Sequence, residues 1–255
     1  MWALRTLLRE PQPVLDRLRR EVGPVCLLGY GPARIAVVGG PRELRDLFSR
    51  PNDDFRWGHP ANTLGFVVGK GSMIVSDGAD HRRRRSPVQH AFAVRRLQQW
   101  IPMIVRRTDC ALDALLASID DGPRQVDLYP VVRRLVLEIV LEALFGERMV
   151  RRADEFGDHF QSLQDYLELP ALRQLPHPIP RTHRARAAAD RRALDAMIDA
   201  EIAERRNDPA DDPLDVLEVL VADGTLTDAE IRDQVVSLVG AGYDTTAAAF
   251  SWLLW

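Results

Sequence analysis

The sequence predicts a mainly α-helical protein with a small β-hairpin near its N-terminus. Apolar residues recur at helical spacing along most of the 255 residues, and 46% of the residues are hydrophobic, enough for a buried core. Only two short runs, Val25–Leu28 and Ile35–Val38, have the composition of strands. The sequence between them, Gly29-Tyr30-Gly31-Pro32, is typical of a turn, so the two runs are expected to pair as a hairpin.

The segments around the hairpin carry helix and loop signals. Apolar residues at helical spacing predict a helix over residues 14–22. Pro41, at a first-turn position, opens a short helix that is expected to end near Phe48. The stretch 51–71 is rich in Gly, Asn and Pro and is predicted to be a long loop.

Helices dominate the rest of the chain. The apolar periodicity predicts helices over residues 79–91, 97–119, 129–145, 149–167, 182–206 and 213–221. Thr227 and Glu230 form a capping box that starts a final helix. Residues 125–128 are expected to form a small strand, and the proline-rich stretch 169–180 is expected to be a connector.

Composition narrows the possible functions. The formal net charge is only −3, so no global field recruits nucleic acid or a membrane. Residues 76–110 are locally basic, with eight arginines against three acidic residues. No apolar run reaches the ~18 residues that span a membrane, and the start lacks a clear signal-peptide core. Cys26 and Cys110 form no CxxC pair, which fits a reducing compartment, so we expect a soluble, cytoplasmic protein.

The first candidate site is the run His81-Arg82-Arg83-Arg84-Arg85. His81 and Arg85 are four residues apart on a predicted helix, so they share a face and can grip an anion together. A solvated basic face and nucleic-acid binding through Arg82–Arg85 remain alternatives. The run has no interleaved aromatic residues and no flanking zinc or recognition-helix signature, which counts against nucleic acid.

The second candidate site is Gly240-Ala241-Gly242-Tyr243-Asp244-Thr245-Thr246, within the final helix. Each glycine weakens a helix interior by roughly 1 kcal/mol relative to alanine. The Thr245 hydroxyl can bond the Ala241 carbonyl four residues back, and we expect this bond to bend and locally open the helix. Asp244 is costly to bury in an apolar helix without a partner or a function. A close helix crossing that needs small residues is the alternative interpretation.

Other chemical motifs are weaker. Gly29-x-Gly31 lacks the third glycine of a dinucleotide-binding fingerprint, so that function is rejected. The histidines after residue 150 are too scattered along the sequence to suggest a metal site. Cys26 is expected to be a buried strand residue and Cys110 a helix residue, and neither is expected to be catalytic.

Both candidate sites together resemble the cytochrome P-450 family of haem-thiolate monooxygenases. Residues 76–85, Ser-Asp-Gly-Ala-Asp-His-Arg-Arg-Arg-Arg, are similar to the start of the C helix in soluble bacterial members, and Ala91-Phe92 continues in register. Residues 241–246 match the I-helix motif [Ala/Gly]-Gly-x-[Asp/Glu]-Thr-[Thr/Ser]. The early hairpin and the proline-rich connector, in the place of the F–G region, also fit. The resemblance covers essentially the whole chain and implies a single cytochrome P-450-like domain over residues 1–255.

The resemblance implies a cofactor and the residues that hold it. The cofactor is haem b, iron protoporphyrin IX, whose propionates would be bound by His81 and Arg85. Ala241, Gly242 and Thr245 would lie beside the cofactor. Asp244 and Thr245 would be catalytic, because in the family they relay protons to the distal oxygen and promote O–O cleavage.

The resemblance also implies the reaction and its partners. The expected activity is hydroxylation of a small organic substrate with dioxygen and electrons from a ferredoxin or flavodoxin-type partner. That partner would be attracted to the basic surface of residues 76–110. Residues 51–71 and 169–180 would border the substrate pocket. Neither nucleic acid nor a membrane is expected as a partner.

Two family motifs are absent from the sequence. It contains neither the Glu-x-x-Arg pair of the K helix nor the Phe-x-x-Gly-x-x-x-Cys-x-Gly loop that supplies the thiolate iron ligand. We therefore expect an N-terminal portion of such a domain that ends within the I helix, has no metal ligand of its own and is inactive alone. A degenerate haem-binding or non-catalytic fragment, and a helical nucleic-acid-binding protein using Arg82–Arg85, are the alternatives.

Overall fold

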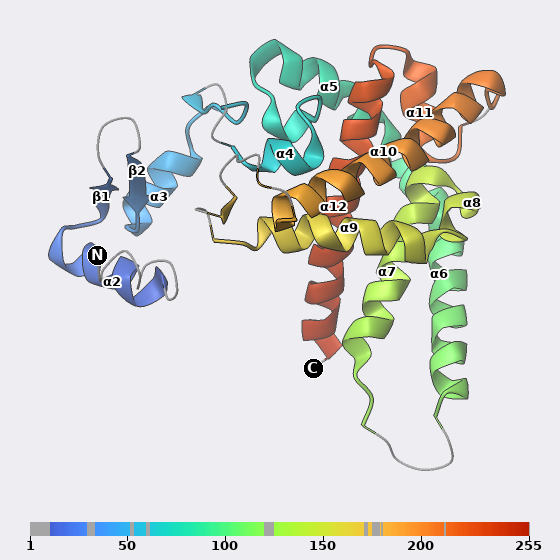
Figure 1. Ribbon diagram of the computed structural model, residues 1–255, viewed down its shortest axis with the longest axis horizontal. Helices are drawn as coiled ribbons and strands as arrows, with labels where there is room; N and C mark the ends of the chain where they lie inside the picture. Colours follow the sequence, from blue (N-terminus) through green and yellow to red (C-terminus); the bar gives the residue numbers. More distant parts are fainter. Residues whose placement is uncertain are drawn as a thin grey trace. The chain divides into compact units, whose positions relative to one another are not determined.

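The computed structural model describes residues 11–29, 34–51, 54–59, 62–119, 125–170, 173–174, 179, 181–211 and 213–254 (Figure 1). The chain divides into two compact units, residues 1–55 and residues 56–255. The predicted fold class, mainly helical with a small antiparallel sheet, is confirmed. The single domain expected over the whole chain stays a prediction. The turn predicted at residues 30–32 and most of the connector predicted at 169–180 lie outside the described residues.

The first unit holds the predicted hairpin between two helices. The helices are α2 (Pro11–Glu21) and α3 (Pro41–Phe48), and proline stands in the first turn of α3, as expected. Strands β1 (Val25–Leu28) and β2 (Ile35–Val38) pair antiparallel, with Val25 opposite Val38 and Leu28 opposite Ile35. The hairpin prediction is confirmed.

The second unit is built from helices around α12 (Figure 1). Its elements are α4 (Leu64–Val68), a 3-10 turn (Met73–Val75), α5 (Gly78–Ala91), α6 (Val94–Ala117), α7 (Leu128–Phe145), α8 (Glu147–Val150), α9 (Ala153–Leu167), α10 (His183–Asn207), α11 (Val216–Asp223) and α12 (Asp228–Leu254). In Figure 1, α6 and α7 run side by side, and α9 crosses in front of α12 next to α10. Because α12 packs on α7 and also contacts α4, α10 and α11, it is the central helix of this unit.

A continuous apolar cluster forms the core of the second unit. The largest fully buried side chains come from α7 to α12 and are Leu141, Phe145, Met149, Phe156, Leu163, Tyr166, Leu194, Ile198, Ile202, Leu217, Leu220 and Ile231. Burial of one such side chain contributes about 1.5–3 kcal/mol. The rings of Phe145, Phe156, Phe160 and Tyr243 follow one another at centroid distances of 6.0, 6.2 and 6.3 Å and so join α7, α9 and α12.

Three predicted elements differ from the structure. Residues 125–127 form no strand, because Asp127 caps α7: its Oδ1 accepts a hydrogen bond from Tyr129 N at 3.0 Å. The helix predicted over residues 149–167 is two helices, α8 and α9. Met149 and Val150, at the end of α8, are buried in the core, and α9 begins at Ala153. The loop predicted over residues 51–71 contains α4, because burial of its apolar residues outweighs the flanking turn signals.

Glu230 joins α5 to α12. The predicted capping box is confirmed, since Thr227 Oγ1 accepts a hydrogen bond from Glu230 N at 3.3 Å and Glu230 Oε2 accepts one from Thr227 N at 3.1 Å. The same carboxylate accepts hydrogen bonds from Arg83 Nη2 at 2.5 Å and Arg84 Nε at 3.0 Å. The Arg83 hydrogen bond is the largest cause that lowers the pKa of Glu230 from 4.5 to about 2.

Replacing this carboxylate by an amide should therefore have a pH-dependent effect. The folded-state pKa of about 2 lies below the ordinary value of 4.5, so ionised Glu230 stabilises the fold above about pH 4.5, and this contribution is lost as the pH falls toward 2. We expect Glu230→Gln to lower the free energy of unfolding at pH 7 by on the order of 1–2 kcal/mol, after allowance for the partial exposure of Arg83. Urea unfolding followed by circular dichroism between pH 7 and pH 3 measures the difference.

Glu168→Gln is the matched control, because Glu168 is exposed and makes no side-chain ion pair with a described residue. Its effect should be small at every pH. A difference between wild type and Glu230→Gln that stays constant as the pH falls would show that the ion pairs with Arg83 and Arg84 do not stabilise the fold.

Candidate functional site

His81 lies in the first turns of α5 and is half-buried. Its Nδ1 is 2.9 Å from the carbonyl oxygen of Met73, at the start of the 3-10 turn. A carbonyl oxygen only accepts, so Nδ1 carries the proton and donates the hydrogen bond. No hydrogen bond joins Nε2 to another described residue, which leaves this nitrogen available to a ligand.

The arginines that follow His81 have different partners. Arg83 and Arg84 bind Glu230, and Arg84 Nη1 also donates to the Lys70 carbonyl at 3.1 Å. Arg85 is exposed and makes no hydrogen bond or ion pair with another described residue. The run is therefore not a uniform basic face, because two of its arginines are held by Glu230 while Arg85, on the same face as His81, stays open.

The second candidate site lies within an unbroken helix. α12 runs from Asp228 to Leu254 without interruption, so the predicted opening at the glycines is wrong. Thr245 Oγ1 donates to the Ala241 carbonyl at 2.5 Å, which confirms the predicted bond, but the helix accommodates it. Ala241 and Thr245 are exposed, whereas Tyr243 between them is buried. Because Ala241 and Thr245 have small side chains and are exposed, one side of α12 is accessible at this motif.

The glycines of the motif are turned toward neighbouring helices. A Cβ at Gly240 would lie 3.4 Å from Phe160 Cζ, and one at Gly242 would lie 3.5 Å from Val140 Cγ2. Both are ordinary van der Waals distances, so alanine would fit at either position. Close packing against α7 and α9 therefore does not require glycine, which counts against the alternative of a small-residue helix crossing.

Asp244 is held by residues of α7. Its Oδ1 accepts hydrogen bonds from Arg133 Nε at 3.3 Å and from Tyr129 Oη at 3.4 Å. Arg133 also donates from Nη2 to Gln164 Oε1 at 2.9 Å, and its guanidinium lies 5.0 Å from the centre of the Tyr243 ring. The Asp244 side chain is 36% exposed, so this carboxylate is only partly buried. Arg133 supplies the partner that the sequence did not reveal.

The two candidate sites belong to the same compact unit but remain separate groups. His81 and Arg85 lie on α5, whereas Ala241, Asp244 and Thr245 lie on α12. No hydrogen bond between described residues joins the two groups directly. They are linked instead through side chains in the first half of α12, which bind α5 and the segment before it.

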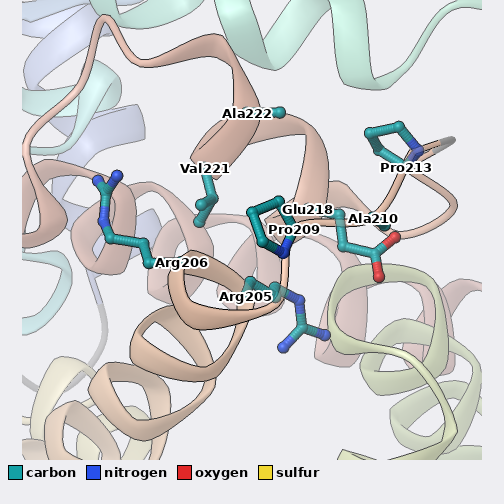
Figure 2. Close-up of a pocket in the computed structure, with 8 residues that line it drawn as sticks. All are labelled: Arg205, Arg206, Pro209, Ala210, Pro213, Glu218, Val221 and Ala222. Carbon is teal, nitrogen blue, oxygen red and sulfur yellow. The ribbon is translucent and has the colours of Figure 1, made fainter.

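Figure 2 shows a pocket that contains none of the predicted site residues. Its volume is about 290 Å3, and it is lined by Arg205, Arg206, Pro209, Ala210, Pro213, Glu218, Val221 and Ala222. The charged groups around it have structural partners. Arg205 Nη2 donates to Asp215 Oδ2 at 2.6 Å and to the Phe145 carbonyl at 2.6 Å, and burial is the largest cause that raises the pKa of Asp215, opposed by Arg205. These contacts tie α7, α10 and α11 together.

A larger open hollow of about 1210 Å3 lies at the C-terminal end of α12. It is lined by residues 125–129 and by Ala248, Ser251, Trp252 and Leu254. Trp252 is 73% exposed. Among the described residues, no group of three or more His, Cys, Asp or Glu side chains could hold a metal ion.

Three contacts around the candidate sites were not found from the sequence. Glu230 was recognised as a capping residue but not as the partner of Arg83 and Arg84. The ion pair of Arg133 with Asp244 has no local signal, because 111 residues separate the partners. Gln234 is fully buried and binds the segment before α5, and no local signal sets it apart because the polar residues Arg232 and Asp233 precede it directly.

The chain is similar in sequence to members of one known protein family. The sequence model of the cytochrome P450 family matches residues 2–255. A Mycobacterium tuberculosis protein named as cytochrome P450 139 is 34% identical over 244 residues, which cover 93% of this chain and 55% of that protein. Another from this species, named as cytochrome P450 137, is 30% identical over 254 residues, covering 92% of this chain and 51% of that protein. The chain thus spans about half the length of these relatives.

A solved structure supports the same assignment at the level of the fold. Retinoic acid-bound cyanobacterial CYP120A1 superposes with a TM-score of 0.79 and 22% identity, covering 97% of this chain and 55% of that protein. None of the helices in the described part of the chain is both long and apolar enough to cross a membrane. From its family match and its sequence relatives, the chain belongs to the cytochrome P450 family of haem monooxygenases.

Proposed function

We propose that this chain supplies the haem propionate-binding and oxygen-side residues of a monooxygenase that hydroxylates a small organic substrate. The observation that carries the proposal is the division of the basic run on α5. Arg83 and Arg84 are used within the fold, whereas Arg85 and the His81 Nε2 atom stay open on one face. A forked donor beside a second donor suits a carboxylate such as a propionate.

The residues of the chain fit a haem. The His81–Arg85 pair offers donors to its carboxylates, and the exposed face of Ala241 and Thr245 carries no bulky side chain that would exclude a flat ring. Gly242 has no side chain and would contribute only main-chain atoms. A side chain at this position would be directed at Val140. When bound, haem b supplies the iron at which dioxygen is activated. We assign no iron ligand to this chain, since its sequence lacks the Phe-x-x-Gly-x-x-x-Cys-x-Gly loop.

Asp244 and Thr245 can hold and transfer protons on the oxygen side. Thr245 Oγ1 donates its proton to the Ala241 carbonyl, so its oxygen is oriented to accept a hydrogen bond. Asp244 is anchored through Oδ1 by Arg133 and Tyr129, and no hydrogen bond joins Oδ2 to another described residue. This arrangement leaves one carboxylate oxygen of Asp244 available to exchange a proton with water.

Electrons would come from an acidic ferredoxin or flavodoxin-type protein that docks near α5. Arg82 and Arg95 are exposed on α5 and at the start of α6, and positive charge on such a surface steers an acidic partner at low salt. Nucleic-acid binding through Arg82–Arg85 is less well supported, because Arg83 and Arg84 both bind Glu230, which engages half of the run within the fold.

Haem binding by the purified chain tests the first step of the proposal. We expect added haemin to bind and Arg85→Gln to weaken this binding about tenfold, the usual size of a lost hydrogen bond to a charged group. The absorption spectrum followed during a haemin titration measures the affinity. Arg151→Gln, at another exposed arginine without a described partner, should leave it unchanged. Equal affinities for the two variants, or no haemin binding by the wild type, would contradict the assignment of Arg85.

The spectrum of the reduced chain under carbon monoxide adds a check on the iron ligand. We expect no thiolate-type Soret band, because Cys26 and Cys110 lie in different compact units and neither belongs to the candidate sites. A thiolate-type band would mean that one of these two cysteines ligates iron, and the assignment of no iron ligand to this chain would be wrong.

A test of the proton-relay role of Thr245 requires an active monooxygenase. The test uses a fusion of this chain with the part of its 34% identical relative that lies beyond the matched region, once that fusion is shown to be active. We expect Thr245→Ala to lower the fraction of consumed oxygen that appears as hydroxylated product and to raise hydrogen peroxide release, because the hydroxyl that accepts and donates protons is lost. Thr246→Ala, at the adjacent exposed threonine, is the matched control. Unchanged coupling in Thr245→Ala would remove Thr245 from the relay.

A further inference from the structure

Side chains of α12 hold the segment that precedes α5. Asp233 Oδ2 accepts a hydrogen bond from Gly71 N at 2.8 Å, and Gln234 Nε2 donates to the Gly71 carbonyl at 2.6 Å. Gln234 Oε1 accepts from Met73 N at 2.9 Å. Three main-chain groups, the N–H and C=O of Gly71 and the N–H of Met73, are thus bound by two neighbouring residues of one helix.

The glycines of this segment make the close approach possible. Gly69 has a φ of +87°, and a Cβ there would lie 2.0 Å from Asp233 Oδ1. At Gly71 a Cβ would lie 2.9 Å from Asp233 Oδ2. No side chain could occupy Gly69 without displacing the carboxylate, which Arg191 Nη2 also holds at 2.5 Å. The Gly-Lys-Gly sequence at residues 69–71 is therefore explained by its contact with α12.

Hydroxyl groups fix the next residue. Ser237 Oγ donates to the Asp233 carbonyl at 2.7 Å, so its single proton is used. The 2.5 Å contact between Ser72 Oγ and Ser237 Oγ must then have Ser72 as the donor. Ser72 Oγ in turn accepts from Ile74 N at 3.3 Å and caps the 3-10 turn.

This attachment reaches His81 through Met73. Gln234 fixes the N–H of Met73, and Ser76 closes the turn, because Ser76 Oγ donates to the Met73 carbonyl at 2.9 Å. The same carbonyl accepts the proton of His81 Nδ1. The position of this carbonyl therefore decides which ring nitrogen of His81 carries the proton and which one is left for a ligand.

We propose that Gln234 is a positioning residue for His81: it holds the Met73 turn so that His81 keeps its proton on Nδ1 and reserves Nε2 for the anionic group that His81 and Arg85 bind. The inference rests on the proposed role of His81 in holding a haem propionate. In the neutral Nδ1–H tautomer, Nε2 carries no proton and cannot donate. His81 therefore donates from Nε2 only as the imidazolium, so it binds a carboxylate as a charged donor. Gln234 itself touches neither His81 nor the ligand.

The tautomer of His81 tests this inference without haem. The chain contains six histidines, so selective 15N-histidine labelling and two-bond 1H–15N correlation spectra can assign each ring, with His81→Gln identifying the signals of interest. At a pH where the ring is neutral, we expect the Nδ1–H form to dominate for His81 in the wild type. In Gln234→Met, which keeps side-chain length and helix propensity, the ratio of Nδ1–H to Nε2–H should fall about fivefold, the value of one ordinary hydrogen bond.

A second buried glutamine provides the control. Gln174 is 9% exposed and donates to the Leu167 carbonyl at 2.8 Å and to the Leu169 carbonyl at 2.6 Å, but it has no contact with residues 69–76 among its described bonds. Gln174→Met should perturb stability in a similar way and leave the His81 tautomer unchanged.

Each outcome decides the inference. An Nε2–H tautomer in the wild type would overturn it, whatever the variants do. An unchanged ratio of Nδ1–H to Nε2–H in folded Gln234→Met would also overturn it. If Gln234→Met does not fold, Gln234→Asn is used instead. Asparagine is too short to keep both bonds, so the same fall in the ratio is expected. A haemin titration of the same samples should show about fivefold weaker binding for Gln234→Met only. Absence of haemin binding in the wild type would refute the proposed function. The tautomer measurement would still decide whether Gln234 positions His81, because it does not depend on haemin.

Discussion

The attachment of the first half of α12 to residues 69–84 is the interaction on which the candidate site depends. Glu230, Asp233, Gln234 and Ser237 are spaced three, one and three residues apart, so they lie on one side of the helix. Each is largely buried and each bonds the segment before α5 or α5 itself. Because a buried polar group without a partner is costly, these residues define one position for that segment on α12.

The same side of α12 changes its environment along its length. Seven residues separate Gln234 from Ala241, nearly two helical turns, so both lie on similar sides of the helix. Gln234 is covered by residues 71–73, whereas Ala241 and Thr245 are exposed. The helix therefore uses one half of this side to position α5 and leaves the other half open. A ligand held by α5 and lying on the exposed part of α12 at Ala241 and Thr245 would contact both candidate sites. The two sites need no direct bond to each other for this.

Local features of this structure could be predicted from the sequence, and distant pairings could not. The hairpin, the capping box of Thr227 and Glu230, and the bond from Thr245 to the Ala241 carbonyl all involve residues close in sequence. The second function of Glu230 joins residues 146 or more apart, and no periodicity encodes it. The predicted helix opening failed because a threonine hydroxyl can share a carbonyl without breaking the helix, and glycines are tolerated where neighbours pack around them.

The position of Asp244 separates anchoring from chemistry. Its partners Arg133 and Tyr129 come from α7, and both donate to Oδ1. A carboxylate with both oxygens bound would be a structural ion pair and nothing more. Here Arg133 is itself fixed by two glutamines of α9, so the position of Asp244 is set by three helices while Oδ2 stays open. An acid that is fixed through one oxygen and open on the other suits the proton relay that we propose for Asp244 and Thr245, and packing alone does not require it.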